Sequence, residues 1–126
     1  MSQRPMPTDA ELQVLAVLWK AGEATVREVH EALAHATGYT TTLKVLQVMA
    51  QKGLVERDES NRSHVYRAKV REEPTRRKLV RELADRAFAG SATQLALAAL
   101  SSRRASAEEL AEVRELLAKL EGGTER

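Results

Sequence analysis

Apolar residues recur every three or four positions over three short stretches in the first half of the chain. The first stretch, residues 9–21, follows Thr8 and has a glutamate three positions after that threonine, which is the capping box that opens many helices. Thr25 opens a second stretch in the same way, and we expect this helix to run for about three turns, up to a break at residues 37–39. A third helix is predicted over about Thr40–Lys52, before a glycine. Its inward face is expected to consist of Leu43, Leu46, Met49 and Ala50.

The pattern changes after this third stretch. Residues 54–57 and 64–67 are short runs compatible with β-strands, and residues 58–62 between them are rich in turn-forming types. Together they predict a β-hairpin.

Helical spacing returns in the second half of the chain. One stretch runs from about Glu73 to Gly90, and a short alanine- and leucine-rich segment follows at residues 93–100. A further capping box at Ser106 opens the last stretch, whose apolar side chains continue to Leu120. The pattern therefore predicts three more helices.

Three helices followed by a hairpin are the order of a winged helix-turn-helix. We expect a mostly α fold with a small β-hairpin, divided into a winged-helix DNA-binding domain, residues 1–70, and a C-terminal helical arm, residues 71–126. The arm is too short to bury a core of its own, so its apolar stripes need a second copy or the N-terminal domain as a partner surface. A homodimer is the preferred interpretation. The expected dimerisation residues are Leu79, Leu83, Phe88, Leu110, Val113, Leu117 and Leu120.

The composition of the chain excludes several classes of function. The chain has no cysteine, which excludes disulfides, thiol catalysis and cysteine-ligated metals. It has no apolar run of the roughly 20 residues that cross a bilayer, and its first residues lack the apolar core of a signal peptide. We therefore expect a cytoplasmic protein without stable membrane association.

The sequence contains no motif that is typical of a catalytic site. His30, His35 and His64 lack metal-ligand spacing, and there is no phosphate-binding loop, zinc-protease helix or glycine-rich dinucleotide motif. The expectation is a protein without a metal, cofactor or enzymatic activity. The net charge of +2 permits nucleic-acid binding only if the positive charge is locally clustered.

The outward face of the third predicted helix has side chains that suit base edges. Threonine methyls contact thymine methyls, glutamine pairs with adenine, and lysine reaches guanine or phosphate. An arginine near the hairpin tip can reach phosphate or the minor groove. The same features also fit a solvated helix face and a hairpin kept soluble by its arginines. The expected DNA-binding residues are Thr40, Thr41, Lys44, Gln47, Gln51 and Arg62.

Several of these stretches resemble the penicillinase-repressor family of the BlaI, MecI and CopY type. The resemblance is clear from Thr8 to about Ala68 and weaker over the C-terminal helices. The similar residues are Thr8–Glu11 with Leu15, Leu18 and Trp19, then Thr25–Val29, Tyr39–Thr41, Lys52–Val55 and Arg62–Tyr66.

This resemblance implies a homodimeric repressor of a resistance or stress operon that binds a pseudo-palindromic operator in double-stranded DNA. It also implies a membrane metalloprotease sensor as a partner, which releases repression by cutting the arm. The Asn-Phe bond cut in beta-lactam-responsive members aligns with Ala98 and Ala99. Many members have Thr and Arg where this chain has Lys44 and Val48, so its operator is expected to differ. The copper-responsive branch has C-terminal cysteines, which this chain lacks, so copper sensing is not expected.

Two other functions fit the same sequence. A winged-helix adaptor would use the third helix to dock a protein and would never bind DNA. A winged helix that senses a small molecule would need an apolar pocket, which a sequence does not reveal.

Overall fold

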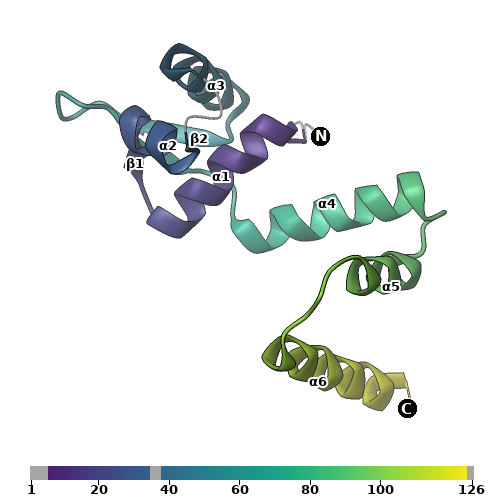
Figure 1. The fold of residues 1–126 in the computed structure, drawn as a ribbon. Coiled ribbons are helices and arrows are strands. Elements are labelled where there is room, and N and C mark those ends of the chain that lie inside the picture. Colours follow the sequence, from purple (N-terminus) through teal and green to yellow (C-terminus); the bar gives the residue numbers. More distant parts are fainter. Residues whose placement is uncertain (1–5, 35–37, 125–126) are drawn as a thin grey trace. The chain divides into compact units, whose positions relative to one another are not determined.

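The computed structural model describes residues 6–34 and 38–124, so two residues considered above, His35 and Thr37, lie outside the described residues. It confirms a mostly α fold with a small antiparallel sheet (Figure 1). The elements in chain order are α1 (Asp9–Ala21), β1 (Ala24–Thr25), α2 (Val26–Ala32), α3 (Tyr39–Lys52), β2 (Val55–Asp58), β3 (Val65–Ala68), α4 (Glu72–Ala87), α5 (Ala92–Ser102) and α6 (Ala107–Thr124).

Both predicted capping boxes of the N-terminal region form. The Thr8 hydroxyl accepts the backbone N–H of Glu11 at 3.2 Å, and the Glu11 carboxylate accepts the backbone N–H of Thr8 at 2.9 Å. Thr25 and its partner glutamate repeat the arrangement at 3.2 and 2.8 Å. The prediction of about three turns for α2 was wrong, because the helix has only 7 residues and Ala34 beyond it turns into the left-handed region at φ 55°.

The hairpin is part of a three-stranded sheet with the strand order β1-β3-β2. β2 and β3 pair antiparallel, with Val55 opposite Ala68, and each begins one residue later than predicted. His64 therefore lies in the loop before β3. β1 was not predicted, because its two residues pair with β3 between two helices and are too few to show an alternating pattern.

One apolar core holds the three N-terminal helices to the sheet. It contains Leu15 and Leu18 of α1, Leu46 and Met49 of α3, and Tyr66 of β3, all essentially without solvent exposure. The predicted inward face of α3 is thus confirmed at its two central positions. The two flanking residues predicted to face inward, Leu43 and Ala50, also pack against the core but are only partly buried.

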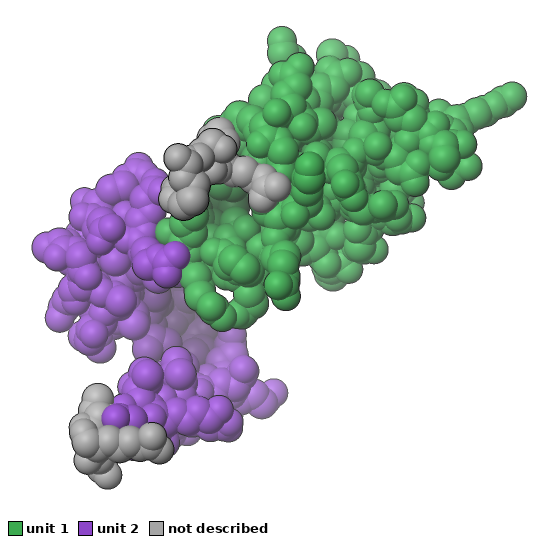
Figure 2. All heavy atoms as spheres, turned by 180° about the vertical axis from the view of Figure 1, so that it is seen from behind, with its two compact units in different colours: residues 1–79 green, residues 80–126 purple. Residues whose placement is uncertain are grey.

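The chain divides into two compact units, residues 1–79 and 80–126 (Figure 2). The division falls within α4. In the second unit, Ala84 is the only buried residue among those described. The long apolar side chains that stay exposed there are Val80, Leu83, Leu97, Leu100, Leu110, Leu116, Leu117 and Leu120.

A partly buried ion pair joins α1 to α3. The Glu11 side chain is 5% exposed, and its second carboxylate oxygen accepts Lys52 Nζ at 2.8 Å. Burial raises the pKa of Glu11, but the hydrogen bonds from Lys52 and Thr8 and the lysine charge outweigh it and leave the pKa below its ordinary value. The first turn of α1 is thereby tied to the last turn of α3.

This ion pair makes folding stability depend on acid. A carboxyl with a lowered folded pKa stabilises the protein above its unfolded pKa, and this contribution is lost as the pH falls through the folded pKa. Glu11→Gln keeps an acceptor for Thr8 but removes the charge, so it should lower the free energy of unfolding by about 1–3 kcal/mol at about pH 7. The deficit should shrink as the pH is lowered towards about 3, because the charge of Glu11 is lost as the pH falls through its folded pKa.

Urea unfolding of both proteins at the two pH values measures the effect. Glu28→Gln is the matched control, because this exposed glutamate occupies the same capping position in α2 and forms no salt bridge within the described residues. A deficit for Glu11→Gln that stays constant with pH would contradict the assignment.

Candidate nucleic-acid interface

The outer side of α3 is an exposed ridge. The buried positions Thr42, Leu46 and Met49 define the side that faces the core. At 3.6 residues per turn, the helix turns its remaining positions to the opposite side. Five predicted residues are exposed there: Thr40, Thr41, Lys44, Gln47 and Gln51. The structure therefore brings all of the predicted α3 residues together on one surface, the α3 ridge.

The buried Thr42 was missed by the sequence pattern, which suggested only apolar residues for the inner side of α3. Its hydroxyl donates to the carbonyl of Gly38 at 3.3 Å and lies 3.4 Å from His30 Nδ1. The His30 ring meets Tyr39 edge-on, with ring centroids 5.8 Å apart. These contacts fix the first turn of α3 against α2, so His30 has a packing role within the helix-turn-helix.

The three arginines of the hairpin have different surroundings. Arg57 pairs with Glu59. Arg67 lies between three carboxylates, at 3.1 Å from Glu23, 3.7 Å from Glu56 and 3.6 Å from Asp58. The third arginine, Arg62, is exposed and forms no ion pair within the described residues. It is also the hairpin arginine that the sequence predicts to bind DNA.

The turn of the hairpin is closed by Asp58. Its carboxylate accepts the backbone N–H of Ser60 at 2.9 Å and the Ser60 hydroxyl at 2.6 Å. These hydrogen bonds lower the pKa of Asp58. The hairpin is thus held at its base by Arg67 and at its turn by Asp58, while Arg62 extends from the loop.

A groove of about 520 Å³ runs between the hairpin and the helix-turn-helix. Its basic side chains come from separate segments: Arg27 from α2, and Arg57, Arg62 and His64 from the hairpin. We call it the wing-side groove. It clusters positive charge that the net charge of the chain does not reveal. The lining residues that sequence reasoning left out of the site are Thr25, Val26, Arg27, Tyr39, Leu43, Arg57, Ser63, His64 and Tyr66.

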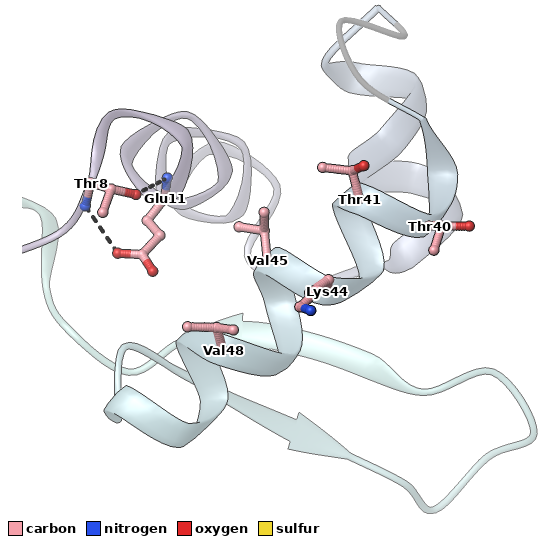
Figure 3. A pocket seen from close by; sticks show the side chains of 7 residues that line it. All are labelled: Thr8, Glu11, Thr40, Thr41, Lys44, Val45 and Val48. Carbon is pink, nitrogen blue, oxygen red and sulfur yellow. Dashed lines mark hydrogen bonds between the residues drawn. The ribbon is translucent and has the colours of Figure 1, made fainter.

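A second hollow, of about 330 Å³, lies on the other side of the α3 ridge, next to the start of α1 (Figure 3). We call it the α1-side hollow. The side chains of Val45 and Val48 point to it from α3, and the Glu11 carboxylate lies on its far wall (Figure 3). Its remaining lining residues are Thr8, Thr40, Thr41 and Lys44. The α3 ridge is therefore flanked by one basic and one largely apolar depression.

Among residues 6–34 and 38–124, no cluster of three or more histidines or carboxylates could hold a metal ion. In the same part of the chain, no helix combines the length and the apolar character that crossing a bilayer demands.

Three helices, a hairpin and a short third strand define a winged helix-turn-helix protein. Two solved structures share this fold. The DNA-binding domain of the repressor BlaI is 28% identical, with a TM-score of 0.50, over 57% of this chain and 90% of that domain. The monomeric form of Bacillus licheniformis BlaI, solved in complex with the blaP half-operator, is 27% identical, with a TM-score of 0.50, over 60% of this chain and 93% of the other.

Sequence comparison gives the family. Residues 7–119 match the penicillinase repressor family, and the transcriptional regulator BlaI of Mycobacterium tuberculosis is 40% identical over 91% of this chain and 85% of that protein. This chain belongs to the penicillinase repressor family. The resemblance found in the sequence is confirmed, and so is the expectation of a non-enzymatic protein, since the family consists of transcriptional repressors.

Proposed function

We propose that this chain is a homodimeric transcriptional repressor that binds a pseudo-palindromic operator in double-stranded DNA. The observation that carries the proposal is the α3 ridge with the wing-side groove beside it. A helix with an exposed polar ridge fits the major groove, and cations beside it meet the phosphate backbone. The fold shared with BlaI, whose structure includes a half-operator, supports the same assignment.

The two parts of this surface have different roles in the proposal. The threonine, lysine and glutamine side chains of the α3 ridge contact base edges and carry specificity. Arg62 and Arg27, which form no ion pairs within the described residues, contact phosphates and carry affinity and register. We also propose that the protein works in the cytoplasm, where it would meet operator DNA.

Binding to its own promoter region tests the proposal. The purified protein should prefer a pseudo-palindrome there to random duplex DNA. If about six phosphates are contacted, affinity should fall on the order of a thousandfold between about 50 and 200 mM salt. Fluorescence anisotropy over a salt series measures both properties. Salt-insensitive binding, or no preference for promoter DNA, would favour the protein–protein adaptor instead.

Single substitutions separate base contacts from phosphate contacts. Thr41→Ala or Lys44→Ala should cost about 1–3 kcal/mol on the operator and much less on random DNA, because a lost base contact matters only on the right sequence. Arg62→Ala should weaken both DNAs about equally and reduce the salt slope by about one. Arg67→Lys is a control for the hairpin, since it preserves the charge while disturbing the carboxylate cluster at its base. If Thr41→Ala lost the same affinity for both DNAs, this result would contradict the placement of α3 in the major groove.

We further propose that the second unit pairs with a second copy of the chain. Its exposed leucines form an apolar surface whose contact with water is unfavourable. A twofold dimer would bury this surface and match the symmetry of a pseudo-palindrome. Leu83, Leu110, Leu117 and Leu120 of the predicted interface are exposed in the single chain. The other three predicted residues are partly exposed: Leu79, Phe88 and Val113.

A charge on this surface should separate the copies. Leu117→Glu would place an unpaired carboxylate in the dimer interface, which is costly to bury. The variant should elute as a monomer and bind the operator weakly, while its N-terminal unit stays folded. Ala111→Glu is the matched control, because it adds the same charge on the side of α6 away from Leu117 and should remain dimeric. Light scattering measures the mass, and a dimeric Leu117→Glu would place the interface elsewhere.

Release from DNA by proteolysis is the last part of the proposal. A membrane metalloprotease sensor would cut between Ala98 and Ala99, the position suggested by the family resemblance. Both residues are exposed but helical within α5, so cleavage requires local unfolding of that helix. Loss of α6 would remove the link between two half-sites, worth about 10²–10⁴ in avidity. Mass spectrometry of the repressor from induced cells distinguishes this cut from an intact arm.

A further inference from the structure

We infer that the α1-side hollow is a subsite for thymine methyl groups of the operator, with Val48 as the residue that contacts them. This inference rests on the proposed function and adds a base preference to it.

The positions of two valines are the starting point. Val45 and Val48 lie on the side of α3 that borders the hollow, and both stay partly exposed (Figure 3). Val48 follows Lys44 by four residues, so it occupies the next turn on the same ridge. Leu46 and Met49 fill the core side of α3, and Val48 is not among the side chains that pack against this core. Its methyl groups therefore stay partly open to solvent.

The chemistry of the hollow selects an uncharged occupant. Both oxygens of the Glu11 carboxylate on its wall are already engaged, by Thr8 and Lys52. Lys52 neutralises this carboxylate, so the α1 wall of the hollow offers a phosphate no free cation, whereas the wing-side groove offers several arginines. Phosphate contacts therefore belong to the wing side of the α3 ridge.

On the edges of bases in the major groove, the apolar group is the thymine C5 methyl. A helix docked by its ridge presents the α1-side hollow to the same groove, so the methyls of Val48 meet that group, while Val45 packs against the core behind it. Lys44 lies beside them with its ammonium free to reach an acceptor on an adjacent base pair. Each half-site should accordingly have a thymine at the position that Val48 contacts.

The experiment replaces thymine by uracil, which lacks only the methyl group. The promoter fragment that the protein binds is amplified once with dTTP and once with dUTP, so its sequence need not be known in advance. The native chain should bind the uracil fragment about fourfold more weakly for each methyl that it buries. Val48→Ala should reduce the native ratio by about fourfold for each methyl that Val48 contacts, and any methyl contacts of the α3 threonines should remain. This variant keeps its fold, because position 48 is partly exposed and alanine favours a helix.

Gln51→Ala is the matched control on the same ridge, and it should retain the native ratio between the two fragments. Equal binding of both fragments by the native chain would overturn the inference. The proposed function would still stand if the chain preferred promoter DNA to random DNA. A ratio unchanged in Val48→Ala would assign the methyl contact to another residue and overturn it as well. Failure to prefer promoter DNA at all would refute the proposed function, and the inference with it.

Discussion

The carboxylate of Glu11 accepts hydrogen bonds from two parts of the fold that are far apart in the sequence. One comes from the backbone of Thr8, where α1 begins, and the other from Lys52, where α3 ends. A buried carboxylate is tolerable only when such partners satisfy it. The same group that starts the first helix therefore sets where the third helix lies, and the position of the α3 ridge depends on this pair.

The second unit follows from a different constraint. Its helices are well capped, as the Ser106 and Glu109 hydrogen bonds of 2.9 and 3.0 Å at α6 illustrate, but capping orders a helix without burying it. Among its described residues only Ala84 is buried. The apolar surface that remains is the physical argument for a second chain, and the proposed dimer would make DNA affinity depend on assembly.

Local features were predictable from the sequence, and features formed between distant segments were not. The capping boxes at Thr8 and Thr25 have short signatures, and the outward face of α3 follows from helical periodicity, so both were found. β1 was missed because two residues carry no pattern. The ion pair of Lys52 and the clustering of Arg27 with the hairpin arginines require segments that only the folded chain brings together. For the same reason the α1-side hollow could not be foreseen.

The carboxylates around Arg67 have a consequence for the entropy of recognition. This side chain connects the hairpin to Glu23, which precedes β1, and so to the helix-turn-helix itself. A hairpin anchored in this way loses its conformational freedom during folding rather than on contact with a ligand. The two halves of the surface are then held in register before any ligand binds. Preorganisation of this kind lets a small surface of modest net charge bind without a large entropic penalty.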